Sequence, residues 1–315
     1  MLWYLSYIFL VVCVLVSVAF FTLMERKILG YIHVRKGPNK VGVMGLFQPF
    51  SDAIKLFSKE MNFMLYMNVL MYMFSPMLAL ILMMMLWFLY NWNYNQISYE
   101  YGLVIMLCIS SLSVYVILWG GWSSNSKYSL LGAYRGVAQV ISYEVSMAMI
   151  LISMIFFCES FNIGKMLEFQ DKFYLLFGYV SLFIIWVVTC FAETNRSPFD
   201  LSEGESELVS GFNIEYSSWG FAVLFMAEYG NMIFFSLVSS YLFMGGEGIL
   251  FIKVMVMMML FVVVRGTLVR YRYDKLMMMA WKVILPFSIL MVMMNFFLKI
   301  LFSWMVCINF SKKDY

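Results

Sequence analysis

The sequence predicts an all-α integral membrane protein, a bundle of helices that cross the bilayer. Of its 315 residues, 63% are hydrophobic and only 12% are charged, which is more apolar surface than one soluble core can bury. Several apolar runs reach the roughly 20 residues that a helix needs to cross the hydrocarbon layer. The alternating ten-residue pattern of transmembrane β-strands does not occur. We therefore expect a single polytopic membrane domain over residues 1–315.

Eight apolar runs are expected to cross the membrane. The first is too long for a signal-peptide core, follows no positive residue and shows no small-residue cleavage site, so we interpret it as a retained span. Pro76 and Pro286 lie inside the second and eighth runs and predict kinks, because proline lacks a backbone donor that neighbouring helices must replace. The runs cover about residues 2–23, 65–90, 101–119, 131–157, 173–192, 219–243, 249–264 and 280–306.

The distribution of basic residues predicts the orientation of the chain. Loops after the first, third, fifth and seventh runs, together with the adjoining starts of the runs that follow, hold 15 of the 21 lysines and arginines. By the positive-inside rule, these loops face the cytoplasm or the mitochondrial matrix. Both termini are then expected on the opposite side.

The first inner loop contains a segment with amphipathic helical periodicity. Between residues 49 and 60, apolar side chains recur at i, i+3, i+4 and i+7, and Pro49 suits the first turn of a helix. The pattern predicts a helix that lies in the membrane interface or, equally, one that covers a soluble partner. A partner that docks at the membrane surface would satisfy both interpretations.

Residues 193–217, which we call the acidic segment, lie on the same side as the basic loops. Six carboxylates and one arginine give the segment a net charge of −5, in a chain of net charge +3. Acidic loops are often only solvated connectors. If the segment instead folds back among the basic loops, its acids would be partly paired, and their protonation would respond to nearby charge. The segment is therefore a candidate switch.

Three glutamates, Glu144, Glu193 and Glu228, lie within or at the edge of predicted spans. A charged carboxylate at mid-bilayer costs on the order of 3 kcal/mol, so each needs a partner, water or a proton. Such acids often mark proton paths, although a carboxyl hydrogen-bonded across helices is a simpler role for Glu144. The aromatic-rich face around Glu228 suits a bundle core or a cavity for a flat ligand. The i, i+3 spacing of Glu193 and Arg196 predicts a local ion pair.

Metal-binding residues are sparse. The five cysteines are isolated from one another, without the paired spacing that binds zinc or iron–sulfur clusters, and the single histidine, His33, lies in a basic loop. If the protein takes part in redox chemistry, its metal centres are expected in another chain.

Six longer blocks carry a family resemblance: Glu25-Arg26-Lys27, Arg35 to Lys40, Gly121 to Asn125, Ala192 to Asp200, Glu203 to Gly211 and Arg270 to Asp274. Together they resemble the chain 1 family of NADH:ubiquinone oxidoreductase, the membrane subunit of respiratory complex I nearest its peripheral arm. The resemblance covers nearly the whole chain and is weaker in the last spans and the ends. It implies eight transmembrane helices with an interfacial helix, in the mitochondrial inner membrane, with the large charged loops facing the matrix and both termini facing the intermembrane space.

The resemblance also implies a function. In that family the subunit forms much of the ubiquinone cavity at the junction with the peripheral arm, and buried acids couple quinone reduction to proton translocation. Carried onto this sequence, Arg26 and Arg35 would line the cavity, and Phe225 would lie near the path of the isoprenoid tail. The implied proton relay consists of Glu144, Glu193, Asp200, Glu203, Glu205 and Glu228.

Cofactors and partners follow from the same resemblance. Ubiquinone is the implied substrate, bound at an interface, whereas FMN and iron–sulfur clusters are implied only in partner subunits. The implied partners are other complex I subunits, including the quinone-module subunits of the peripheral arm and neighbouring membrane-arm subunits, together with membrane lipid and no nucleic acid. The isolated chain is not expected to catalyse NADH oxidation.

Two alternative functions stay open at this stage. A free-standing proton- or cation-coupled transporter would also use intramembrane acids, but the chain shows no internal repeat, and its large charged inner surface suits docking. The equivalent subunit of membrane-bound hydrogenases shares the sequence blocks and need not use quinone. A requirement for added quinone would separate that subunit from the leading hypothesis.

Overall fold

The computed structural model describes residues 2–90, 100–170, 174–204, 211–245 and 249–311, with side chains placed for residues 5–301 within those ranges. The described residues form helices and connecting loops without strands, and seven helical stretches are long and apolar enough to cross a membrane. This confirms the predicted class of helical integral membrane protein. Six of the seven are α1 (Leu2–Ile32), α3 (Val69–Phe88), α4 (Gly102–Ser123), α5 (Lys127–Cys158), α10 (Ser218–Phe243) and α11 (Leu250–Thr267).

The seventh stretch is a continuous helix that contains one π-helical turn. α12 (Tyr273–Met279) passes through a π-helical turn, Ala280–Ile284, into α13 (Leu285–Ser311). The π turn ends two residues before Pro286, which has no backbone N–H to donate a helical hydrogen bond. Proline therefore changes this helix locally without ending it.

The run predicted over residues 173–192 is not one continuous helix. It forms a short α7 (Leu175–Gly178) and then α8 (Val180–Glu193), with Tyr179 between them at φ −131° and ψ 49°. The 14 residues of α8 rise about 21 Å, less than the roughly 30 Å of a bilayer core. Its C-terminal residue, Glu193, consequently ends inside the protein and is buried.

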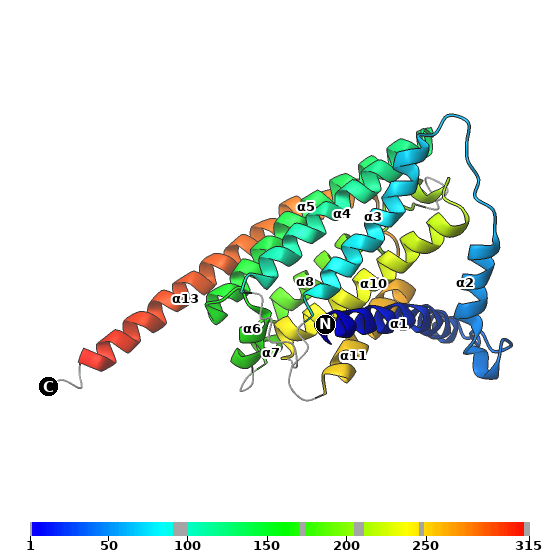
Figure 1. Ribbon diagram of the computed structural model, residues 1–315. Coiled ribbons are helices and arrows are strands. Elements are labelled where there is room, and N and C mark those ends of the chain that lie inside the picture. The colour runs from blue at the N-terminus through cyan, green and yellow to red at the C-terminus, as the bar shows by residue number, and fades with distance from the viewer. Residues whose placement is uncertain (1, 91–99, 171–173, 205–210, 246–248, 312–315) are drawn as a thin grey trace.

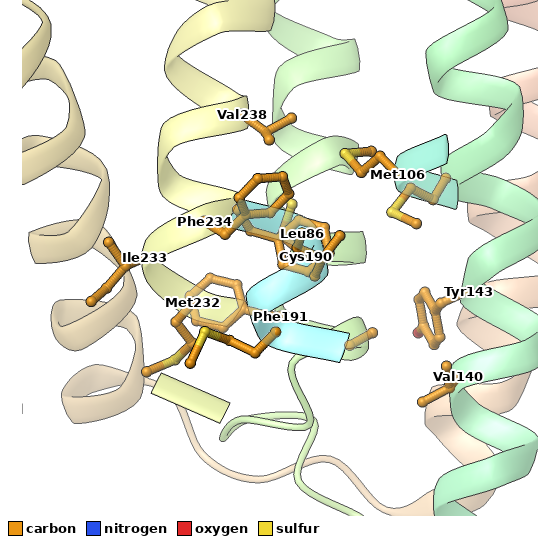
Figure 2. Close-up of a cluster of buried hydrophobic side chains, with 14 of the residues drawn as sticks. Leu86, Met106, Val140, Tyr143, Cys190, Phe191, Met232, Ile233, Phe234 and Val238 are labelled. Atoms are coloured by element: carbon orange, nitrogen blue, oxygen red, sulfur yellow. The ribbon is translucent and has the colours of Figure 1, made fainter. Parts of the chain in front are cut away.

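The helices form two groups, as Figure 1 shows. α3, α4, α5 and α13 lie side by side along one side, and α10 lies between them and the pair α1 and α11. All residues of α10 from Met232 to Phe243 are buried, so this helix forms the centre of the core. Figure 2 shows the core at that level, where Phe234 of α10 lies beside Leu86 of α3 and Cys190 of α8.

The predicted amphipathic helix is present as α2 (Gln48–Ser58). It lies at one end of the bundle, outside the group of long helices, and contacts α1 and α10 (Figure 1). Its apolar side chains Phe50, Ile54 and Phe57 are exposed, which leaves an apolar face available to lipid or to a partner.

Candidate functional site

The described part of the acidic segment folds back into the bundle. Its residues Leu201, Ser202 and Phe212 are buried. Gly132 of α5 admits it, because a Cβ atom there would lie only 2.8 Å from the Cα atom of Gly211. The alternative of a solvated connector is therefore wrong for these residues.

A side-chain amide of α5 fixes the start of the segment. Gln139 donates from Nε2 to the carbonyl oxygens of Ala192, at 2.8 Å, and Phe199, at 2.7 Å. Both bonds are buried, so they hold the chain on either side of Glu193 and Arg196 against α5. The end of α8 is thereby positioned inside the membrane domain.

A basic loop pairs with the segment, as the sequence predicts for a segment that folds back. Arg270 donates to both the backbone carbonyl and the carboxylate of Asp200. The next residue, Tyr271, donates its amide to the Pro198 carbonyl at 3.1 Å, and its ring stacks on Phe199 at a centroid distance of 5.4 Å. The loop after α11 and the acidic segment therefore form one packed unit.

Arg196 occupies the centre of the site. Its buried guanidinium lies over the Tyr229 ring at 4.2 Å and near the Phe225 ring at 5.8 Å, both within the range of cation–π attraction. Its Nη2 atom is 3.8 Å from Oε2 of Glu228. The predicted local pair with Glu193 is wrong: α8 ends at Glu193, so the two side chains do not share a helical face, and Arg196 turns toward α10.

Glu25, part of the Glu25-Arg26-Lys27 block, is a buried acid. It accepts a hydrogen bond from the Tyr229 hydroxyl at 2.5 Å and pairs with Arg265 of α11. The apolar run ends near residue 23, but α1 continues to Ile32 and carries Glu25 into the bundle. The sequence signal that could have revealed this burial is that Glu25 continues the helical periodicity just beyond the apolar run.

Two of the predicted intramembrane acids line one cavity. A space of about 70 Å³ between α3, α4 and α10 is lined by Glu193, Glu228 and Asn231, with serines of α4 and aliphatic residues of α3. Within the described residues, Glu193 Oε2, Asn195 Oδ1 and Asn231 Oδ1 have no hydrogen-bond partner. The other lining residues are mainly apolar, and a cavity of this size has room for water beside the polar side chains.

The other described relay acids interact with the two that line the cavity. Glu144 is partly buried on α5 and interacts electrostatically with Glu193. Glu203 accepts a hydrogen bond from Asn213 at 2.7 Å, and Glu228 interacts electrostatically with both Glu203 and Asp200. Burial raises the pKa of Glu203, although the Arg196 charge opposes the shift. Five predicted relay acids are thus brought together, and the sixth, Glu205, lies outside the described residues.

The predicted quinone-binding residues lie nearer α2. Arg26 pairs with Asp52 of α2 at 2.5 Å, and both side chains are partly exposed. Arg35 is exposed, and its backbone amide bonds the Gly30 carbonyl at 2.8 Å. Phe225 of α10 packs against Phe221 at a centroid distance of 4.3 Å. Of these three residues, it is Phe225 whose ring lies near the Arg196 guanidinium, at 5.8 Å.

Metal ligands do not gather in the described part of the chain. Among those residues, no group of three or more His, Cys, Asp or Glu side chains could hold a metal ion. The cysteines Cys13, Cys108, Cys158 and Cys190 are free thiols there.

Comparison with known proteins gives consistent matches. A family model described as NADH dehydrogenase matches residues 5–296. NADH-ubiquinone oxidoreductase chain 1 of Rhipicephalus sanguineus is 54% identical over 307 residues, which cover 98% of each chain. The protein of the same name from Aedes aegypti is 51% identical over 89% of this chain and 90% of its own length. That of Balaenoptera physalus is 45% identical over 93% of this chain and 95% of its own.

Proposed function

This chain belongs to the NADH dehydrogenase family, and we propose on that premise that it couples ubiquinone reduction to proton translocation as a membrane subunit of NADH:ubiquinone oxidoreductase. In this role it forms much of the ubiquinone cavity at the junction with the peripheral arm. The membrane is the mitochondrial inner membrane, with the basic loops in the matrix and the termini in the intermembrane space.

The cavity that contains Glu193 and Glu228 is the observation that carries the coupling proposal. Two carboxyl side chains and Asn231, whose amide oxygen is unpaired, line a space whose other walls are mainly apolar. Such groups are expensive in a membrane interior and suit the binding and transfer of protons. Glu144 extends the set across α5, and Glu203 and Asp200 extend it toward the basic loops.

Ubiquinone would enter at α2. The exposed apolar side chains of α2 and the aromatic pair Phe221 and Phe225 suit an isoprenoid tail, whereas Arg26 and Arg35 suit a polar head group. A neighbouring quinone-module subunit of the peripheral arm would complete the cavity. FMN and iron–sulfur clusters held by partner subunits would supply the electrons.

Coupling follows from charge. Reduction of ubiquinone to ubiquinol takes up two electrons and two protons, so the charge near the cavity changes during each turnover. Arg196 contacts the Glu228 carboxylate and the rings of Phe225 and Tyr229, so it can relay that change from the quinone side to the buried acids. A shift in the position of its charge alters the protonation of Glu203 and Glu228.

Purification of the native complex tests the proposal. After extraction in a gentle detergent, the fraction that contains this chain is examined by low-temperature paramagnetic resonance and by an NADH-to-ubiquinone assay. We expect a very large particle with iron–sulfur signals and inhibitor-sensitive quinone reduction. Recovery as a small particle without those centres would contradict the proposed function.

A further inference from the structure

The structure has a second feature that the relay does not use, at the proline of α3. Pro76 has no backbone N–H, so the carbonyl of Tyr72, four residues earlier, lacks its helical donor. That carbonyl is not left unpaired, because the hydroxyl of Tyr216 lies 3.2 Å away and donates to it. Tyr216 thus replaces the hydrogen bond that proline removes.

The contact between the two tyrosines is reciprocal. Their rings stack at a centroid distance of 4.3 Å, and the Tyr72 hydroxyl donates to the Glu215 carbonyl at 2.6 Å. Ser75 lies 2.6 Å from the Tyr216 hydroxyl and can donate to it, which leaves the Tyr216 proton for the Tyr72 carbonyl. All of these residues except Glu215 are buried.

Residues 212–218, which we call the junction segment, connect this contact to two other parts of the protein. Toward the acids, Phe212 lines the cavity, and Asn213 donates to Glu203. Toward α2, the Ser217 hydroxyl accepts from the Asn62 amide at 3.1 Å, and the Ser218 hydroxyl donates to the Lys59 carbonyl at 2.6 Å. The junction segment therefore links the end of α2 with the acids.

The same helix that Tyr216 holds also forms a wall of the cavity. Ala79, Leu82 and Leu86 of α3 follow Pro76 and face the space that contains Glu193 and Glu228. Proline allows α3 to change direction at this level, so the distance of this wall from the acids depends on what holds the helix there. Two side chains can donate to the freed carbonyl of Tyr72: the Tyr216 hydroxyl at 3.2 Å, which reaches it from the junction segment, and the Ser75 hydroxyl of α3 itself at 3.4 Å.

We propose that Tyr216 is a positioning residue for proton transfer: by capping the carbonyl freed by Pro76, it holds the α3 wall of the cavity to the junction segment. This inference rests on the proposed function of the acidic cavity. Loss of the cap leaves the ring stack and the Tyr72–Glu215 hydrogen bond as the contacts that join α3 to the junction segment. This weaker attachment lets the separation of Glu193, Glu203 and Glu228 vary more during turnover.

The test uses Tyr216→Phe in the assembled complex, which keeps the ring and removes only the donor. We expect the number of protons pumped per electron to fall and the turnover rate to fall by about fivefold, the factor that the loss of one hydrogen bond typically brings to an equilibrium. The KM for ubiquinone should stay unchanged, and the pH profile of turnover should shift. Tyr7→Phe is the matched control, because Tyr7 donates to the Met84 carbonyl of the same helix, where residue 88 supplies a helical donor.

Pro76→Ala provides the decisive comparison. It supplies the missing N–H at position 76, so Tyr216→Phe should have little further effect in that background. Equal effects of Tyr216→Phe in the wild type and in the Pro76→Ala background would overturn the inference, as would unchanged turnover and pH profile in the single variant. If the single variant fails to assemble, restored assembly in the double variant supports the inference, and failure of both contradicts it. Recovery of the wild-type chain as a small particle without iron–sulfur signals would instead refute the proposed function itself.

Discussion

Arg196 is the residue that most clearly orders the site. It is buried, it lies over Tyr229, and it faces Glu228. A buried guanidinium needs compensating charge, and here the compensation comes from acids on α1, α10 and the acidic segment. Because Arg196 in turn partly compensates the charge of these acids, a change in the protonation of one acid alters the electrostatic environment of the others.

Glu144 gives a direct test of the acid chain. We expect Glu144→Gln to lower turnover coupled to pumping by about tenfold or more, because a proton-transfer group is removed. Assembly should persist, since glutamine keeps the shape of the side chain. Proton uptake and NADH oxidation in reconstituted vesicles measure the effect. Glu159→Gln is a control at the other end of α5, where the carboxyl is exposed and pairs with Lys299; normal pumping in Glu144→Gln would remove Glu144 from the relay.

The raised pKa of Glu203 should make the stability of the folded protein depend on pH. Burial raises its pKa above the ordinary value of 4.5, so the folded protein binds this proton more tightly than the unfolded chain. Stability contributed by the protonated group is present at low pH and is lost as pH rises through the raised pKa. Glu203→Gln should therefore be more resistant to thermal inactivation than the wild type at neutral pH, with the difference shrinking toward pH 4.5.

Thermal inactivation of the purified complex across this pH range measures that difference. The control is Glu60→Gln at an exposed position, which should follow the wild type at every pH. A constant difference between Glu203→Gln and the wild type would mean that proton binding at Glu203 does not contribute.

At the scale of elements, α5 and the acidic segment come into close contact at Gly132 and Gly211. Gly132→Ala would place a Cβ atom against the backbone of Gly211, which cannot yield as a flexible side chain can. We expect a cost of about 1–3 kcal/mol and less assembled complex on native gels. Gly120→Ala on α4 is matched to it, because its Cβ would meet Phe212 at an ordinary 3.4 Å. Equal abundance of the two variants would show that the segment can move away from α5.

Substitutions in the Arg26–Asp52 pair between α1 and α2 can distinguish an effect on ubiquinone binding from an effect on protein stability. The Arg26–Asp52 pair is partly exposed, and such pairs contribute about 0–1 kcal/mol, so its loss should not unfold the protein. We expect Arg26→Gln to raise the KM for ubiquinone and to weaken quinone reduction, measured from the dependence of rate on quinone concentration. Asp52→Asn breaks the same pair but keeps the cation. An unchanged quinone response in Arg26→Gln would argue against a role for Arg26 in the cavity.

At the scale of the whole molecule, the basic loops predict the orientation in the membrane. In mitoplasts, only the intermembrane-space face of the inner membrane is accessible to added protease. The protease should remove an epitope at the N-terminus and leave the loop around Lys36 and Lys40 uncut. Inverted vesicles stripped of the peripheral arm should give the opposite result. Cleavage at Lys36 in mitoplasts would reverse the proposed topology.

Several features of this protein followed from its sequence alone. Long apolar runs determined the membrane class, and amphipathic periodicity determined α2, because both depend on neighbours within a few residues of the same chain. The positions of Glu144, Glu193 and Glu228 along the helices followed for the same reason. The break at Tyr179 did not, since an apolar run of sufficient length does not reveal where its helix is interrupted.

Only the tertiary structure decided which charges meet. Glu25 and Tyr229 are 204 positions apart, and Tyr216 caps a carbonyl 144 positions away. Arg196 turned from its near neighbour Glu193 to Tyr229 and Glu228 because helix packing, and not sequence spacing, brought α10 beside it. Local pattern decides where a polar group lies along its helix, but its partner depends on how all the helices pack, because buried polar groups take whichever partner packing brings within reach.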